Sequence, residues 1–554
     1  MMDVPLTTRT LIDRCLHLHP ERPVTSLLIA GKNEAGQPVP GTHRSTLGEA
    51  AARAGQLAGA LKDAGVAQGD RVATLAVNSS SHLEAYLGVS SMGAVIHTLN
   101  IRLPVEQLVW IINDAQDRVL LLDPMFLPML PAFQANCPSI ERYVVFGRDG
   151  AAPEGTQAYE AFIAGQPATF DWPDLDERSG AMLCYTSGTT GNPKGVLYTH
   201  RSLMLHALAG GHKSAFDIGE EDTVLPIVPM FHANAWGTVH CAALYGAGLV
   251  FTGVFNDGPT VARMLEQEKV TMCAGVVTVM LALLAELDRA GEAGQPYDLS
   301  HLNLIGCGGT AVPEALIRAL HFRHGLRMMQ AWGMTETSPL ATTSNAPVGV
   351  DPASDEGFTH RSKQGRVMPF TEVDLIDDEG ADVPHDGQTM GRLLVRGPWV
   401  TGEYYRRGVT GDFVTRRGKR WLDTGDIATL SPGGEVWVQD RAKDLVKSGG
   451  EWISSAEIEN ALMAHPHVAA AVVVAVPHEK WTERPLALVI PRGEAPKPED
   501  LRAHLQGRVA KWWIPDDFVM VESLPIGATG KFLKREIRDQ YRNHAWPAAG
   551  AGTG

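Results

Sequence analysis

The sequence predicts an α/β fold in which a large N-terminal domain is followed by a small α+β domain. Three observations lead to this expectation. Short apolar strands alternate with helical patterns over the first 150 residues, which is typical of parallel sheets covered by helices. A glycine- and hydroxyl-rich segment at 185–195 directly follows a short apolar strand. Near residue 440 a charged and then glycine-rich stretch precedes a compact pattern of about 100 residues, a usual domain size.

The composition limits the classes of protein that the chain can be. A length of 554 residues is too great for one ordinary core, and 44% apolar with 20% charged residues describes a globular protein. The net charge of -15 argues against broad nucleic-acid binding. The six cysteines form no C-x-x-C pair, so neither a zinc cluster nor a disulfide scaffold is expected.

The same sequence predicts a cytoplasmic protein without a transmembrane segment. Residues 1–15 contain no apolar core of a secretory signal. The longest apolar run, at 468–476, has nine residues, which is far too few to cross a bilayer.

The N-terminal elements begin with a capping box, T-x-x-E, from Thr46 to Glu49. It predicts a helix over 46–65 in which Leu57 and Leu61 share a face. The next elements expected are a buried strand at 71–77, a helix at 81–97, and short strands at 117–123, 142–147 and 181–185.

The C-terminal elements begin with a second capping box, from Ser454 to Glu457, which opens a helix to about Ala464. The pattern then predicts a strand at 468–476, a helix at 498–513, a strand at 517–521 and a closing helix at 533–542. We expect the tail, 546–554, to be disordered.

The segment "YTSGTTGNPKG", from Tyr185 to Gly195, predicts a phosphate-binding loop. Glycines let backbone N–H groups approach an anion, and hydroxyls and a lysine add donors. The spacing is not G-x-x-x-x-G-K-[ST], so the loop is not that of a P-loop ATPase. An ordinary surface loop is the alternative for this motif alone.

Further motifs follow in order: "PMFHANAWG" (229–237), "GCGGTAVPEA" (306–315), "QAWGMTET" (330–337), "WLDTGD" (421–426), "DRAKDLVKSGGEWIS" (440–454) and "PIGATGKFLK" (525–534). Over about residues 10–540 this set resembles the adenylate-forming superfamily of acyl-CoA synthetases, luciferases and peptide-synthetase adenylation domains. Within that family it is most similar to the medium- and long-chain fatty acyl-CoA ligases.

The resemblance implies a domain organisation and a reaction. We expect a multi-subdomain N-terminal domain (1–440) with mixed, largely parallel sheets, a hinge (441–447) and a small mobile α+β domain (448–545). The implied substrates are a small-molecule carboxylic acid, ATP and CoA, with Mg²⁺ as the metal. A carboxylate is a poor electrophile, and an acyl-adenylate supplies the leaving group that a thiol can displace. A homodimer is left open.

The nucleotide site implied by the resemblance can also be understood from its side chains. Trp332 offers a flat face for adenine, Thr335 a hydroxyl for the α-phosphate, and Asp426 a carboxylate for the ribose hydroxyls, with Arg441 as its partner. Glu336 is a hard oxygen ligand suited to Mg²⁺, which it would share with Thr186. The full expected set is Thr186, Ser187, Gly188, Thr189, Thr190, Lys194, Gly308, Gly309, Thr310, Gln330, Ala331, Trp332, Gly333, Met334, Thr335, Asp426, Arg441 and Trp452. Core packing for Trp332 and turn chemistry for Asp426 are the alternatives.

Lys531 is the expected catalytic lysine, because its point charge could bridge the acyl carboxylate and the α-phosphate. A solvated surface lysine is the alternative. The family's second basic position in this loop is occupied here by Ile526. Lys443 stands at the hinge position, and rotation there would bring a CoA-side face to the site. That face comprises Lys447, Ser448, Gly449 and Gly450.

The acyl pocket implied by the resemblance has a catalytic His232 beside the reacting carboxylate and Trp236 as an aromatic gate. Both residues could instead be core side chains. The expected lining is His232, Ala233, Trp236, Val277 and Gly308. Val277 stands where the family usually has proline, so the chain length of the acid is left open.

The alternative activities are a ligase for a short thioether acid such as methylthiopropionate or for an aryl acid, and an adenylating enzyme that loads a separate carrier protein. A non-catalytic sensor is a third class, which the presence of Lys531, Glu336 and Thr186 argues against.

Overall fold

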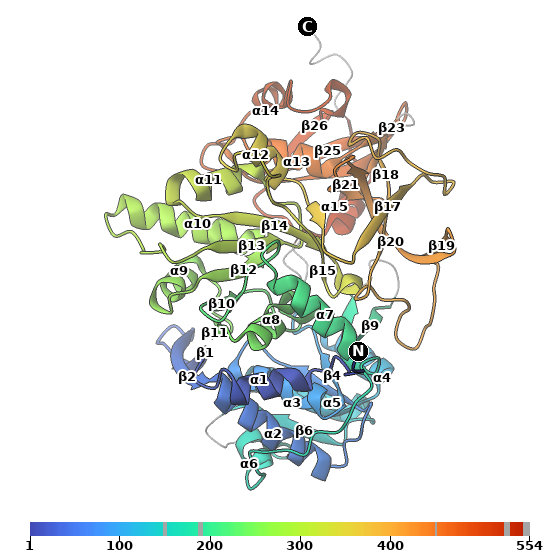
Figure 1. The fold of residues 1–554 in the computed structure, drawn as a ribbon. Coiled ribbons are helices and arrows are strands. Elements are labelled where there is room, and N and C mark those ends of the chain that lie inside the picture. The colour runs from blue at the N-terminus through green and yellow to red at the C-terminus, as the bar shows by residue number, and fades with distance from the viewer. Residues whose placement is uncertain (148–151, 187–191, 449–450, 526–531, 547–554) are drawn as a thin grey trace.

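The computed structural model describes residues 1–147, 152–186, 192–448, 451–525 and 532–546. The predicted α/β fold class is confirmed. Two large β-sheets with their helices form the N-terminal part, and a smaller β-sheet with its own helices forms the C-terminal part (Figure 1). None of the helices in these ranges combines the length and the apolarity needed to traverse a bilayer. All six cysteines are buried free thiols.

Sheet 1 has seven strands in the order β7-β6-β5-β3-β4-β8-β9, and all neighbours are parallel except β8 and β9. Because β8 and β9 form an antiparallel hairpin, the glycine-rich segment between them lies at the carboxyl end of β8. The strands are β3 (Arg71–Leu75), β4 (Val95–Thr98), β5 (Asp117–Leu122), β6 (Arg142–Val145), β7 (Gln157–Ala158), β8 (Gly180–Thr186) and β9 (Lys194–Thr199).

Sheet 2 has the strand order β17-β18-β20-β21-β16-β15-β14-β13-β12-β10-β11-β1-β2, with β19 beside β20. The central run from β14 to β1 is parallel, and both ends are antiparallel. The strands are β1 (Pro23–Lys32), β2 (Pro38–Thr46), β10 (Thr223–Pro226), β11 (Gly248–Phe251), β12 (Met272–Val276), β13 (Leu304–Gly308), β14 (Met328–Gly333), β15 (Leu340–Thr343), β16 (Gly365–Val367), β17 (Glu372–Ile376), β18 (Gly391–Arg396), β19 (Phe413–Arg416), β20 (Lys419–Leu430) and β21 (Glu435–Arg441).

Helices of the N-terminal part cover these sheets, and α7 and α8 lie between the two sheets (Figure 1). The main apolar core joins them, with Leu57, Val89, Leu203 and Val239 buried in one cluster. The helices are α1 (Arg9–His17), α2 (Leu47–Asp63), α3 (Ser80–Ser91), α4 (Val105–Ala115), α5 (Leu130–Asn136), α6 (Tyr159–Ile163), α7 (His200–Gly211), α8 (Thr238–Tyr245), α9 (Gly258–Gln267), α10 (Val277–Glu292), α11 (Glu314–His324) and α12 (Asp355–Arg361), with 3₁₀ turns η1 (Pro124–Met129) and η3 (Thr335–Thr337).

The small domain is built on sheet 3, in the order β23-β22-β25-β24 with β26 parallel to β25. Met390 of the large domain packs against its apolar cluster. Its elements are β22 (Val446–Ser448), β23 (Glu451–Ile453), α13 (Ser455–Met463), β24 (Val468–His478), β25 (Thr482–Pro491), α14 (Pro498–Leu505), the 3₁₀ turn η4 (Lys511–Trp513), β26 (Asp517–Met520) and α15 (Lys534–Gln540). Trp546 donates a hydrogen bond to the Pro477 carbonyl (2.9 Å), and the rest of the expected tail lies outside the described residues.

Two predicted helices were too long. The helix expected at 81–97 ends at Ser91, and Val95–Thr98 form β4, buried between β3 and β8. Gly93, with φ +91, makes the turn between them. The helix expected at 498–513 ends at Leu505, because Gly507 adopts φ +74 before a separate 3₁₀ turn.

Candidate active site

The β8–β9 hairpin fixes the ends of the expected phosphate loop. Thr186, the last residue of β8, lies opposite Lys194, the first residue of β9. Ser187, Gly188, Thr189 and Thr190 lie outside the described residues. The hairpin therefore presents a hydroxyl and an ammonium side by side at the sheet edge where ligands bind in open α/β folds.

Lys194 contacts a segment at 401–412 that the sequence analysis did not include. Its Nζ lies 2.6 Å from Asp412 Oδ2 and 4.7 Å from the centre of the Tyr404 ring. The Thr410 hydroxyl donates to the same carboxylate oxygen (2.7 Å). Burial raises the pKa of Asp412, but these two hydrogen bonds outweigh it and lower the pKa below its usual value. Lys194 is thus held in place by an ionised partner that a phosphate could replace.

Glu336 is buried in η3 and is held by the same segment. Its Oε1 accepts a hydrogen bond from the Tyr404 hydroxyl (2.9 Å), and its carbonyl accepts from the Thr401 N–H (2.7 Å). Burial raises the pKa of the Glu336 carboxyl, while the Tyr404 hydrogen bond and the charges of Arg441 and Lys194 oppose this rise. The Tyr198 hydroxyl of β9 donates to the Thr335 carbonyl (2.8 Å), which joins η3 to the hairpin.

This donor set fits Mg²⁺ bound largely through phosphate oxygens. Among the described side chains no group of three or more His, Cys, Asp or Glu residues could enclose a metal ion. Mg²⁺ commonly uses only one or two carboxylates together with phosphates and water. Glu336, buried with cationic groups near it, is a carboxylate of the kind expected there, and Thr186 is the last residue of β8.

Asp426 lies at the centre of a second polar group, formed by β14, β20 and β21. Its Oδ1 is 2.9 Å from Arg441 Nε, and its Oδ2 accepts from the Trp332 indole N–H (3.0 Å). Arg441 also donates to the Thr424 carbonyl (3.0 Å). The structure therefore brings together the three residues expected at adenine and ribose. It also shows the indole acting as a hydrogen-bond donor, a role that the expectation of stacking did not include.

The glycine-rich turn after β13 is packed tightly against β14. A Cβ on Gly308 would lie 2.4 Å from the Ala331 carbonyl oxygen and 3.5 Å from Trp236. The Gln330 side chain donates to the Ser362 carbonyl (2.9 Å) and accepts from the Val312 N–H. Gln330 therefore fixes this turn with its amide group, and Gly308 places the turn against the expected gate.

The gate segment, residues 233–237, has an unusual backbone. Ala233, Asn234, Ala235 and Trp236 all have φ between 43 and 57, the left-handed region that costs about 1–2 kcal/mol for each non-glycine residue. All of them are buried, and His232 directly precedes them. Strain of this kind collects at functional sites. A Cβ on Gly308 would touch Trp236, so the gate segment lies next to the turn after β13. Val277 begins α10 and is only partly buried.

The hinge and CoA-side residues lie at the junction with the small domain. The Lys443 carbonyl accepts from Arg538 (2.9 Å), the Lys447 N–H donates to Glu483 (2.9 Å), and Arg484 donates to the Ser448 hydroxyl (3.1 Å). Trp452 lies opposite Lys447 in the β22–β23 pair. Gly449, Gly450, Ile526 and Lys531 lie outside the described residues.

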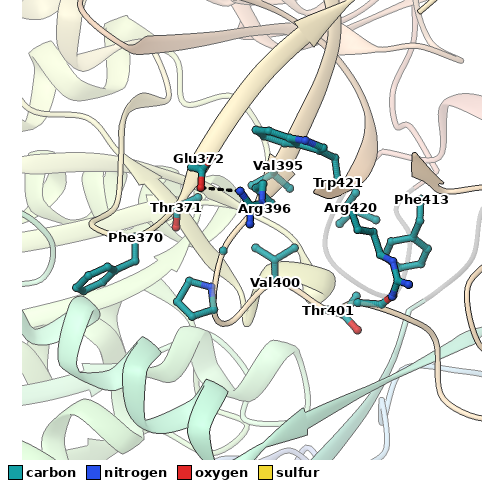
Figure 2. A pocket seen from close by; sticks show the side chains of 14 residues that line it. Phe370, Thr371, Glu372, Val395, Arg396, Val400, Thr401, Phe413, Arg420 and Trp421 are labelled. Atoms are coloured by element: carbon teal, nitrogen blue, oxygen red, sulfur yellow. Dashed lines mark hydrogen bonds and ion pairs between the residues drawn. The ribbon is translucent and has the colours of Figure 1, made fainter. Parts of the chain in front are cut away.

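A wide groove of about 920 Å³ has Thr401 and Gly402 in its wall, and none of the expected site residues lines it. Figure 2 shows its aromatic and charged walls, where Arg396 pairs with Glu372 (2.8 Å). Arg420 likewise donates to the Gly402 carbonyl (3.0 Å). Both cations are thus paired within the groove.

Sequence reasoning missed three supporting residues: Tyr198, Tyr404 and Asp412. Tyr198 lies three residues beyond Gly195, the last residue of the predicted phosphate-binding segment. Tyr404 and Asp412 lie in "TGEYYRRGVTGDF", where no spacing rule singles them out. Their partners are 68 and 218 residues away along the chain, so only the fold reveals them.

Comparison with known proteins adds an independent finding. The family model described as "AMP-binding enzyme" matches residues 19–405, and "AMP-binding enzyme C-terminal domain" matches residues 457–531. The chain is 43% identical to a 3-methylmercaptopropionyl-CoA ligase of Ruegeria pomeroyi over 98% of both chains. It is also 43% identical to a long-chain-fatty-acid–CoA ligase of Thermus thermophilus over 98% of this chain and 97% of the relative. Among solved structures, an anthranilate CoA ligase in complex with anthranoyl-AMP matches with a TM-score of 0.84 and 25% identity, over 97% and 98% of the two chains.

Proposed function

The chain belongs to the AMP-binding enzyme family and is an adenylate-forming acid:CoA ligase, and from this premise we propose that its acid is a medium- or long-chain fatty acid. Enzymes of this kind use ATP, Mg²⁺ and CoA. The observation that carries the proposed reaction is the linkage of Lys194 and Glu336 through Tyr404, with the charge of Arg441, the partner of Asp426, also acting on Glu336. The identity to a long-chain ligase supports the choice of acid.

In the first half-reaction the fatty acid carboxylate attacks the α-phosphorus of ATP, and pyrophosphate leaves. Lys194 and the hydroxyls of the phosphate loop bind the β- and γ-phosphates, and Asp426 binds the ribose. Lys531 stabilises the charge that develops between the carboxylate and the α-phosphate. Glu336 and Thr186 would hold Mg²⁺ together with the phosphates, and the bound ion would supply additional positive charge there.

In the second half-reaction the CoA thiol attacks the acyl carbon, a thioester forms, and AMP leaves. We propose that the small domain turns at Lys443 between the two steps, which withdraws Lys531 and brings in the face with Lys447 and Ser448. His232 lies beside the reacting carboxyl, and Trp236 closes the alkyl pocket.

A cytoplasmic location belongs to the same proposal. Light scattering of the purified protein tests whether it forms a homodimer.

A second candidate is a ligase for a short thioether acid, and one observation favours it: the 43% identity to a 3-methylmercaptopropionyl-CoA ligase. A panel of acids from C3 to C16, with methylthiopropionate and benzoate, decides between the two candidates. Thioester formation and AMP release are measured with CoA as the only acceptor. We expect the highest kcat/KM with a saturated acid of eight or more carbons. A higher value for methylthiopropionate would establish the second candidate, and no thioester with CoA alone would point to a carrier protein as acceptor.

A further inference from the structure

The start of α13 is bonded to the end of β21, across the expected hinge. The Ser454 hydroxyl donates to the Gln439 carbonyl (2.5 Å). The Ser455 N–H donates to Asp440 Oδ2 (2.8 Å), and the Ser455 hydroxyl donates to the same oxygen. Asp440 precedes Lys443, whereas both serines follow it. These bonds therefore join the two sides of the proposed pivot.

Lys534 of α15 reinforces this junction from the small domain. Its Nζ donates to the Ser455 hydroxyl oxygen (2.6 Å) and lies 2.8 Å from Glu459 Oε1. The side chains of Lys534 and Glu459 are only 17% and 15% exposed. Burial raises the pKa of Glu459 to about 7. Burial also opposes the charge of Lys534, but Glu459, Asp440 and Asp444 outweigh it and raise the pKa of Lys534.

The junction continues into the nucleotide site. Asp440 Oδ1 accepts from the Arg441 N–H (2.8 Å), and Arg441 pairs with Asp426. An unbroken series of contacts thus runs from Lys534 through Ser455, Asp440 and Arg441 to the carboxylate proposed to bind ribose. The start of α13 thus contacts both α15 and β21, and the three elements lie in one region of the ribbon view (Figure 1).

We propose that Lys534 and Ser455 are positioning residues, which hold Asp440 so that Arg441 stays on Asp426 and the small domain keeps the orientation of this structure. This inference rests on the proposed function, since it concerns the balance between the two half-reactions. Rotation about Lys443 moves Ser455 away from Asp440, so the contact breaks and re-forms in every catalytic cycle. A contact of this kind sets the fraction of time that each orientation is populated.

The test uses the full-length protein with Ser455→Ala and Lys534→Met. A third variant, Lys534→Met with Glu459→Gln, removes both charges and avoids leaving an unpaired buried carboxylate. Lys497→Met is the matched control, because Lys497 is an exposed lysine of the same domain. Two rates are measured in each protein: acyl-adenylate formation from decanoate and ATP, and thioester formation from supplied decanoyl-adenylate and CoA.

We expect the ratio of the two rates to change at least about 5-fold in Ser455→Ala and in both Lys534 variants, the lower end of usual coupling between sites. The control should keep the ratio of the unmodified protein. A junction that only stabilises the fold would lower both rates alike, and an unchanged ratio in all three variants would overturn the inference. If Lys534→Met fails to fold, judged by circular dichroism, Ser455→Ala and the double variant decide.

Limited trypsin digestion gives a readout that does not depend on activity. Arg441, Lys443 and Lys447 are cleavage sites within the hinge. Breaking the junction should increase the rate of cleavage there at least about 5-fold in the variants, by the same coupling argument, and not in Lys497→Met. Unchanged cleavage in Ser455→Ala would also overturn the inference. If the variants are cleaved faster but the unmodified protein forms no acyl-adenylate, the role of the junction is supported and the proposed function is rejected.

Discussion

At the scale of single residues, the site depends on side chains that hold charged groups in a buried place. Glu336 is 6% exposed, and the Tyr404 hydroxyl is its hydrogen-bond donor. Asp426 is 3% exposed and lies between Trp332 and Arg441. A buried carboxylate without such partners would lose its charge, because burial favours the neutral acid. The Tyr404 hydrogen bond and the nearby cations therefore oppose the rise that burial gives to the pKa of Glu336.

Tyr404→Phe should move the acidic limb of adenylation to higher pH. The hydrogen bond from Tyr404 lowers the pKa of Glu336, so its loss lets burial raise that pKa further. A function that requires ionised Glu336 is present above its pKa and is lost as the pH falls through it. The phenyl ring keeps its contact with Lys194. We expect kcat/KM for ATP near neutral pH to fall about 10-fold or more, since hydrogen bonds to charged groups are worth about 1.5–3 kcal/mol.

The measurement is a pH profile of pyrophosphate release in the two proteins. Tyr405→Phe is the control, because Tyr405 meets the β8–β9 hairpin through its backbone N–H, which donates to the Gly195 carbonyl (2.8 Å). If the pH profiles of Tyr404→Phe and the unmodified protein superimpose, ionisation of Glu336 does not control the rate of adenylation.

Asp426→Asn should raise KM for ATP about 10-fold or more while leaving KM for the acid nearly unchanged. The substitution removes the charge that pairs with Arg441 and that the proposed function assigns to the ribose hydroxyls. A hydrogen bond to a charged group is worth about 1.5–3 kcal/mol, which corresponds to about 10-fold or more. Asp423→Asn is the matched control on the same strand, since Asp423 pairs with Arg392 instead. A parallel rise in the KM values for ATP and for the acid would show that Asp426 supports the folded structure and does not bind the nucleotide.

At the scale of elements, local signals located the helices and strands that were predicted within 46–185 and 454–542, with two of the helices predicted too long. Thr46 caps α2 as its T-x-x-E pattern predicts, with both reciprocal hydrogen bonds present. The error at 81–97 has a physical cause: a short apolar run fits a helix or a buried strand equally well. Val95–Thr98 became a strand because β3 and β8 lie on either side of it. No signal within the run itself contains that information.

Gly308→Ala should destabilise the protein by about 1–3 kcal/mol, the usual cost of overpacking. The new Cβ would meet the Ala331 carbonyl, which is backbone, so β14 would have to shift together with the turn. Urea denaturation measures the change in the free energy of unfolding. Gly31→Ala is the control, because no heavy atom lies within 4 Å of a Cβ built there. Equal stability of the two variants would show that the β13–β14 contact can relax.

At the scale of the whole molecule, the motif order identified the family and the two parts, while the support of each site residue came from the structure. The carboxylate of Asp426 and its partner Arg441 were expected from the resemblance, and the structure places them together. The 401–412 segment was not expected, because its contacts with β9 and η3 arise only when the two sheets meet. The hinge at Lys443 remains a prediction.

Lys443→Pro should leave one turnover of adenylation and strongly reduce thioester formation. Proline fixes φ near -65° and removes a backbone donor, so one of two domain orientations becomes costly. Lys443→Ala should be milder, because it leaves φ free.

Lys531→Ala should show the opposite pattern, with adenylation reduced about 10²–10³-fold and thioester formation from supplied acyl-adenylate largely kept. Single-turnover yields of both products test all three variants, and a normal thioester rate in Lys443→Pro would place the pivot elsewhere.

The 401–412 segment has a consequence for how the large domain melts. It bonds to β9 of sheet 1 through Gly195, to α4 through the Asp114 carbonyl, which accepts from Arg406 (2.7 Å), and to the sheet 2 side through Glu336. Neither sheet can open alone without breaking those bonds and exposing the helices packed between the two. The large domain should therefore absorb heat in one cooperative transition in scanning calorimetry, although its two sheets resemble separate units. The small domain, joined by fewer contacts, is free to melt as a transition of its own.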